Sequence, residues 1–390
     1  MPSVNPEVLV WARQTAGLSL EAASKSLSLG GKKASGAAVL ASLEAGTREP
    51  TRPLLLKMAS VYRRPLLVFY LPKPPQTADK GEDFRTLPEH LKADSNGTLD
   101  ALVRDIYVRK ELVKSALYDI EEAEKLSFVG SLSMEVPVGR AAEILGISIG
   151  FDINEFRKRA KPEDAFTYLR NLVEQAGVFV LLIGNLGSHH TDIPVEAFRG
   201  FALADEVAPF IVINDQDAPA ARAFTLVHEL AHIFLGVTGI SGNFSEIKIE
   251  RYCNDLASQL LLPDHDLAGV AWEFDGIADL VAKVAAYARG LNISGSLVAY
   301  RLLTSGAVSQ DEWDEASRML RTLWLEFKAS QKATRKKDQK IPYYVVKRHK
   351  LGNSLVELVG RTMQEGSLTA TKAARVLGVK PANVYNLVGA

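Results

Sequence analysis

The stretch that decides the fold reads Thr225-Leu226-Val227-His228-Glu229-Leu230-Ala231-His232-Ile233-Phe234-Leu235-Gly236. It contains the pattern His-Glu-x-x-His, with two histidines four residues apart. On an α-helix, residues at this spacing lie on one face, with about 5–6 Å between their Cβ atoms. His228 and His232 can therefore hold one Zn²⁺ ion between their rings, and Glu229 can reach a water molecule at the metal. The pattern predicts a zinc hydrolase in which Glu229 is the general base.

Apolar residues fill most of the rest of this stretch, so the helix is expected to be buried. Two imidazoles and a carboxylate inside a buried helix are costly unless they are paired or bind a metal. A polar cluster satisfied by hydrogen bonds alone is the alternative. The metal site is favoured because a third ligand is available further along the chain.

That third ligand is expected from a second helix, over residues 249–262, which ends at Pro263. Glu250 supplies the carboxylate that a three-ligand zinc site needs. Asn254 lies four residues on and on the same face, where it can hydrogen-bond a ligand histidine and fix its tautomer. Glu246 is the rival third ligand, and an ion pair with a surface lysine or arginine is the other role open to Glu250.

Three short apolar runs, over residues 177–183, 198–203 and 209–214, predict a small sheet before the zinc helix. The remaining patterns are helical, so the predicted fold class is mainly α with a small β-sheet (α+β). In zinc peptidases with this motif, a sheet edge beside the metal can bind an extended substrate by strand addition.

Length and composition set outer limits on the class of protein. A chain of 390 residues is long enough for two or three domains, and its net charge of zero confines any nucleic-acid binding to local patches. The single cysteine, Cys253, excludes an internal disulfide and suits a reducing compartment. No apolar run approaches the roughly 20 residues of a membrane span, and the first ten residues lack the features of a signal peptide. We expect a cytoplasmic protein that does not bind membranes.

Residues 1–75 predict four or five short helices with glycine turns, as in a helix-turn-helix module. They hold ten Lys/Arg against four Glu and no Asp, a surplus that attracts phosphates. In this interpretation residues 37–45 form the recognition helix. The candidate DNA-contacting residues are Lys32, Lys33, Ser35 and Ser42. The alternative is a helical domain that binds protein, because residues 36–41 offer few side chains for base edges.

The predicted domain boundaries follow from composition. Residues 76–98 are a polar linker, 99–303 the zinc domain, and 304–390 a helical C-terminal region. Within that region residues 328–350 hold nine Lys/Arg and one Asp. Such a run is usually a solvated linker, with nucleic-acid contact as the alternative. The spacing over residues 369–387 fits a second small helix-turn-helix.

Three segments resemble the ImmA/IrrE family of metallo-endopeptidases, in the version with an N-terminal Xre-type helix-turn-helix domain. Residues 43–51 resemble the end of the Xre domain, 224–232 the family's zinc helix, and 249–263 its third-ligand helix. By position, the resemblance implies that His228, His232 and Glu250 bind zinc and that Glu229 is the general base. Many relatives have a second acidic residue where this chain has Tyr252.

The resemblance also implies a substrate class: regulatory proteins, typically Xre-type repressors, cleaved in stress responses or in the control of mobile elements. A toxin-like partner encoded beside this protein is a further candidate. The residue that helps the metal stabilise the oxyanion is left open among Tyr252, His265, His189 and His190. The alternative function is a DNA-binding regulator or antitoxin-like protein whose zinc domain senses or scaffolds without proteolysis.

Overall fold

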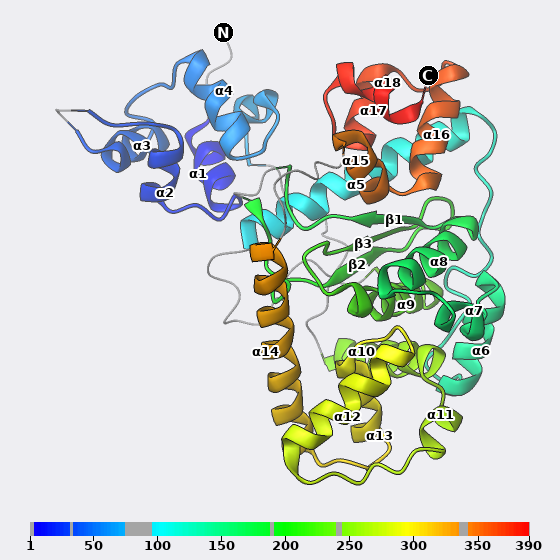
Figure 1. Cartoon of the computed structure of the whole chain (residues 1–390). Helices are drawn as coiled ribbons and strands as arrows, with labels where there is room; N and C mark the ends of the chain where they lie inside the picture. The colour runs from blue at the N-terminus through cyan, green and yellow to red at the C-terminus, as the bar shows by residue number, and fades with distance from the viewer. Residues whose placement is uncertain are drawn as a thin grey trace. The chain divides into compact units, whose positions relative to one another are not determined.

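The computed structural model describes residues 4–31, 34–74, 96–187, 191–238, 244–334 and 342–389. The chain splits into two compact units (Figure 1). Of the described residues, the first unit contains those up to Ile106 and those within 185–197, and the second contains the rest. The predicted fold class is confirmed, since the described elements are mainly helices with one three-stranded sheet.

The first unit is built from helices α1 (Pro6–Gln14), α2 (Leu20–Ser26), α3 (Gly36–Glu44) and α4 (Arg52–Val61), followed by the 3₁₀ helix η1 (Leu66–Tyr70). Serine side chains fix the start of two of them, because Ser19 accepts the N–H of Ala22 and Ser35 accepts that of Ala38. The apolar core of these helices consists of Val8, Leu9, Ala12, Ala23, Leu27, Leu40, Leu43, Leu55, Met58, Tyr62 and Phe69. Residues 75–95, which hold most of the predicted linker, lie outside the described part of the chain.

The sheet of the second unit has strands β1 (Phe179–Leu182), β2 (Gly200–Leu203) and β3 (Phe210–Ile213) in the order β1-β3-β2. β1 runs parallel to β3, and β2 runs antiparallel to it. The strands fall within the three predicted apolar runs. Nearly every strand residue is buried, which explains why these runs are continuously apolar instead of alternating.

Helices α8 (Pro162–Gln175) and α9 (Pro219–Phe234) lie on the same side of this sheet (Figure 1). α9 packs on β2 and β3, and α8 packs on β1 and on α9. α10 (Phe244–Leu261) packs on α9 and on α6 (Val138–Ile149), and α7 (Ile153–Arg157) packs on α8. The predicted zinc helix is therefore enclosed between the sheet and α10.

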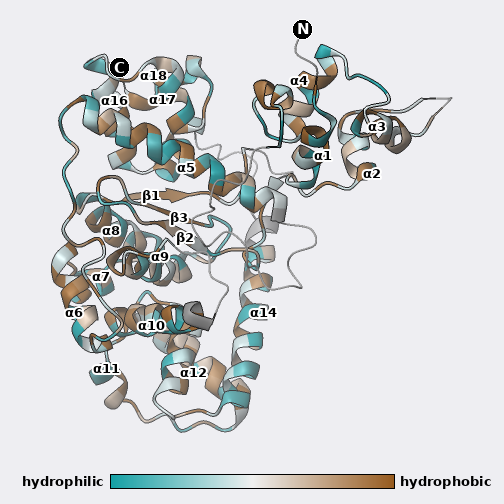
Figure 2. Cartoon of the chain, turned by 180° about the vertical axis from the view of Figure 1, so that it is seen from behind, coloured by the Kyte–Doolittle hydropathy of each residue, from teal (hydrophilic) through white to brown (hydrophobic). Residues whose placement is uncertain are grey.

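The remaining elements form two further groups. Helices α12 (Gly276–Gly290), α13 (Gly295–Thr304) and α14 (Gln310–Thr334) pack on one another, after the short α11 (Asp264–Ala268). Helices α15 (Tyr343–Leu351), α16 (Asn353–Gln364), α17 (Ala370–Leu377) and α18 (Val384–Val388), with the 3₁₀ helix η4 (Pro381–Asn383), form a small bundle. α15 of this bundle packs against β1, which is brown, and thus apolar, in Figure 2.

One long helix, α5 (Asn96–Asp119), spans the boundary between the two units. Along the described residues, every helix is either too short or too polar to cross a bilayer.

Candidate metal centre

The predicted zinc helix is α9. It begins with Pro219 in its first turn, a position where proline is favoured because its missing N–H has no intrahelical partner. All residues from Thr225 to Phe234 are buried, including the three polar ones of the motif. His228 is 8% exposed, Glu229 6% and His232 2%. Side chains of this kind at such burial need a compensating partner.

Helix α10 supplies that partner through Glu250. Its Oε2 lies 3.2 Å from Nε2 of His228, and its Oε1 lies 3.1 Å from Nε2 of His232. The two Nε2 atoms are themselves 3.2 Å apart. Two histidines on one helix and a carboxylate on the next thus aim three ligand atoms at one point.

These separations fit a metal ion. In a tetrahedral zinc site with bonds of about 2.0–2.2 Å, neighbouring ligand atoms are about 3.4 Å apart. The ligand atoms of His228, His232 and Glu250 all lie within 4.8 Å of one another and could hold such an ion. Nδ1 of both rings is buried and has no hydrogen-bond partner among the described residues. The rings are therefore held by packing, with Nε2 as the atom offered to the metal.

Burial and charge set the protonation of the two carboxyl groups. Burial, with a smaller effect of Glu250, raises the pKa of Glu229 to about 8, against the opposing effect of His232. Burial also acts to raise the pKa of Glu250, but contacts with His228 and His232 outweigh it and hold that pKa well below its usual range. Glu250 is therefore a carboxylate, the form that binds metal, whereas Glu229 can exchange a proton near neutral pH.

Residues 185–303 match the family model of the IrrE N-terminal-like domain, Peptidase_M78. The IrrE-like segment contains β2, β3 and α9 to α13, so the histidines and both glutamates fall within it. The match supports a metallopeptidase of the IrrE type. Neither the search of curated proteins nor that of solved structures found a match to the chain. The helices of the first unit lie outside the IrrE-like segment, so the Xre-type helix-turn-helix stays a prediction.

Other residues predicted at the site have different partners. The hydroxyl of Tyr252 donates to the backbone oxygen of Val136 at 2.8 Å, so it is used in packing α10. His265 is exposed, and its ring lies 3.7 Å from Asp266. Asn254 makes no hydrogen bond to the histidine rings, whose Nδ1 atoms lack a partner among the described residues. Its role in orienting a ligand stays a prediction.

Five predicted residues have side chains outside the described part of the chain: Lys32, Lys33, His189, His190 and Glu246. Ser35 and Ser42 are described, and both hydroxyls are engaged within α3. Ser35 caps this helix, and Ser42 donates to the backbone oxygen of Val39 at 2.7 Å. These bonds reduce what either serine can offer to a base edge.

A glycine beside Glu229 was not predicted. A Cβ atom on Gly200, the first residue of β2, would lie 2.9 Å from Oε1 of Glu229. Only glycine allows the strand to pass so close to Glu229. The sequence signal was available, because a glycine inside an apolar strand often marks a close approach of backbone to another group.

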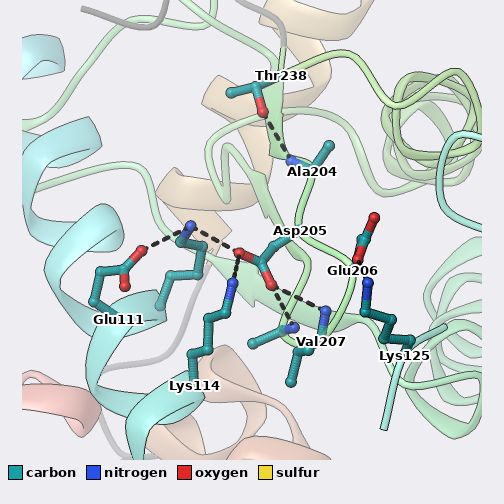
Figure 3. Close-up of polar contacts among 10 residues, drawn as sticks. Glu111, Lys114, Lys125, Ala204, Asp205, Glu206, Val207 and Thr238 are labelled. Atoms are coloured by element: carbon teal, nitrogen blue, oxygen red, sulfur yellow. Dashed lines mark hydrogen bonds and ion pairs between the residues drawn. The ribbon is translucent and has the colours of Figure 1, made fainter. Parts of the chain in front are cut away.

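A second unpredicted feature fixes the other end of β2 (Figure 3). Oδ2 of Asp205 accepts hydrogen bonds from Lys114 at 2.7 Å and from Lys110 at 3.1 Å, both on α5. Oδ1 accepts the backbone N–H groups of Val207 and Ala208 at 2.9 and 3.1 Å. Burial acts to raise the pKa of Asp205, but these bonds outweigh it and keep the pKa well below its usual range.

The same end of β2 is tied to the segment that follows the zinc helix. The backbone N–H of Ala204 donates to Oγ1 of Thr238 at 3.1 Å (Figure 3). Thr238 lies four residues beyond the end of α9 at Phe234. Strand β2 thus lies against α9 at Gly200, and just beyond its other end Ala204 is hydrogen-bonded to the segment that follows α9.

Proposed function

We propose that this chain is a zinc-dependent endopeptidase that cleaves a regulatory protein. The observation that carries the proposal is the convergence of His228, His232 and Glu250 on one point, next to the buried Glu229. The match of residues 185–303 to the IrrE N-terminal-like domain supports the same activity.

The proposed mechanism assigns one role to each residue. When bound, zinc polarises a carbonyl group and lowers the pKa of water toward about 7. His228, His232 and Glu250 would hold the ion. Glu229 takes the proton of the attacking water and returns it to the leaving amine. Burial raises the pKa of Glu229 and so favours its accepting a proton.

The proposed substrate is an Xre-type repressor or a toxin-like partner encoded beside this protein, in a stress response or in mobile-element control. The support is the resemblance of the first unit to an Xre domain, since a helical module of that type can recognise a homologous repressor or its DNA. The edge strand β2 gives an extended substrate a place to bind by strand addition, alongside Glu229.

The test is to incubate the protein with the neighbouring repressor or toxin-like protein and to identify the products by mass spectrometry. We expect one or a few defined cuts with zinc present and none after chelation. Glu229→Gln should abolish cleavage while retaining zinc, because the amide cannot accept the proton and the three ligands are unchanged. Glu273→Gln, which removes an exposed carboxylate elsewhere in the second unit, is the matched control. Cleavage by Glu229→Gln at the wild-type rate would exclude this mechanism.

A second candidate function is DNA-binding regulation without proteolysis. It is favoured by the surplus of Lys/Arg in residues 1–75 of a chain whose net charge is zero. A gel-shift assay with the DNA upstream of its own gene separates the two functions. Salt-sensitive and sequence-selective binding, with no cleavage of any neighbouring protein, would favour the regulator.

A further inference from the structure

The last 48 described residues form a bundle that lies outside the IrrE-like segment and has an apolar core of its own. Helices α15 to α18 contact one another, and α15 also packs on β1. The largest buried side chains of the bundle are Leu351, Leu355, Val356, Leu358, Val359, Leu368, Val376, Leu377, Val384 and Leu387. None of these residues belongs to the metal centre, so the function of the bundle must be explained separately.

Its last two helices are short and are joined by a turn, as in a helix-turn-helix. Thr369 caps the start of α17, where its side chain accepts the N–H of Lys372, and Gly378 caps its end in the left-handed conformation (φ 60°). Six residues later α18 begins at Val384, which is fully buried, and α18 packs on α17. Two short helices joined by a turn that contains glycine are the framework with which many regulators read DNA.

The charge of the bundle complements DNA. Residues 342–389 hold seven Lys/Arg and two Glu, in a chain whose net charge is zero. Of these seven, Lys350 and Arg361 pair with Asp215 and Glu122 outside the bundle, and Arg348 pairs with Glu357 within it. A Cβ at Gly378 would meet the guanidinium of Arg109 on α5. Lys372 on α17, Lys380 in the turn and Tyr385 on α18 are exposed. These three exposed side chains are basic or able to hydrogen-bond.

Asn386 on α18 is placed to form hydrogen bonds with a base. It is exposed, and its Nδ2 donates to the hydroxyl of Tyr344 on α15 at 2.9 Å. That hydroxyl in turn donates to Oδ1 of Asn383 at 3.3 Å. The bond from Asn386 uses one amide hydrogen. The amide oxygen and the second hydrogen are the pair with which asparagine recognises adenine.

We infer that α17 and α18 bind duplex DNA, with α18 in the major groove. Asn386 and Tyr385 face the base edges, and Lys372 and Lys380 contact phosphates on either side. This binding is independent of any DNA binding by the first unit. It also stands whether or not the chain is a peptidase, because it involves no residue of the metal centre.

The experiment begins with selection of sites from a pool of random-sequence duplex DNA by the full-length protein. Affinities for a selected duplex and for an unselected one are then measured over a range of salt concentrations. We expect Lys380→Glu to weaken binding to both duplexes by about tenfold and to reduce the salt slope by about one. Asn386→Ala should weaken binding to the selected duplex by about tenfold and leave binding to the unselected duplex nearly unchanged.

The matched control is Arg289→Glu, the same change of charge at an exposed residue of α12, far from the bundle in Figure 1. It should bind as the wild type does. Thermal unfolding of each variant shows whether the fold is intact. The inference is overturned if the full chain selects no duplex, or if folded Lys380→Glu and Asn386→Ala proteins bind as the wild type does. Binding that survives both changes would belong to another part of the chain.

Discussion

Gly200 on β2 lies directly against Glu229 on α9, so that a Cβ atom at Gly200 would be 2.9 Å from the carboxylate oxygen Oε1. The same Cβ would lie 2.6 Å from Cγ2 of Thr225. Thr225 is buried, and its hydroxyl donates to the backbone oxygen of Ala221, so its side chain has little room to turn away. Any larger residue at this position must push the strand and the helix apart.

Gly200→Ala should therefore reduce cleavage of the partner protein while zinc content stays at the wild-type level. A displacement of about 1 Å at the general base costs on the order of a hundredfold in rate. The change does not touch His228, His232 or Glu250, so metal analysis should show no loss. Gly139→Ala on α6 is the control, because a Cβ there meets nothing within 4 Å. Equal rates for both variants would show that the close approach has no bearing on Glu229.

Metal analysis also distinguishes the two candidate third ligands. Glu250→Ala should weaken zinc binding by at least about a hundredfold, since even the loss of a residue that only orients a ligand costs 10–100-fold. Glu246→Ala should bind zinc as the wild type does. The measurement is a zinc titration of the metal-free proteins. The opposite result would make Glu246 the ligand and leave the two histidines in place.

The elements that the sequence predicts well are those whose signal is local. The spacing of His228 and His232 on one helix face needs no tertiary information, and the three strands follow from continuous apolar runs. The strand order β1-β3-β2 was not predictable in this way, because no local pattern states which strand pairs with which. Glu250 is an intermediate case: its helix was evident, but only the packing of α10 on α9 brings it to the histidines.

Asp205 shows why other parts of the site could not be predicted. In the sequence it is one of two acidic residues in a turn between strands, which is an ordinary place for aspartate. Its partner Lys110 is 95 residues earlier in the chain. An ion pair at this separation leaves no periodicity or motif in the sequence, and it becomes apparent only when α5 and β2 are in place.

Asp205→Asn is expected to destabilise the protein in a manner that depends on pH. The pKa of Asp205 is lowered in the folded state, so its contribution to stability is fully present above its unfolded pKa of about 3.9. That contribution is lost as pH falls through the lower, folded pKa. At pH 7 the change should cost about 1–3 kcal/mol, because the buried Lys110 loses one of its two carboxylate partners and keeps only Glu111 at 2.9 Å. Below about pH 4 the difference between variant and wild type should shrink.

Urea unfolding at pH 7 and at steps down to pH 3 provides the measurement. The neighbouring residue is the control: Glu206 pairs with Lys125 at 2.5 Å, but both side chains are mostly exposed (Figure 3). Glu206→Gln should cost less than about 1 kcal/mol at every pH. If the two variants lost the same stability at pH 7, the buried cluster at Asp205 would have no special role.

Gly352, between α15 and α16, lies where the C-terminal bundle contacts Arg170 and Glu174 of α8. Oε2 of Glu174 accepts the backbone N–H groups of Asn353 and Ser354 at 3.1 and 3.3 Å, at the start of α16. Arg170 donates to Oε1 of the same carboxylate at 2.9 Å, and both charged side chains are buried. These bonds form only because the backbone at Gly352 comes close to both charged groups.

Gly352→Ala should break this junction. The residue has a φ of 85°, and a Cβ would lie 2.9 Å from Nη2 of Arg170 and 3.0 Å from the backbone oxygen of Val180. Separating the buried pair from α16 should cost about 3–5 kcal/mol and should raise hydrogen exchange in α16. Gly366→Ala has a similar positive φ of 77° but meets nothing within 4 Å, so it should cost only about 1–2 kcal/mol. Hydrogen exchange read by mass spectrometry, with α12 as an internal reference, compares the two variants. Equal exchange in α16 would mean that backbone strain alone, and not the contact with Arg170 and Glu174, requires glycine at this position.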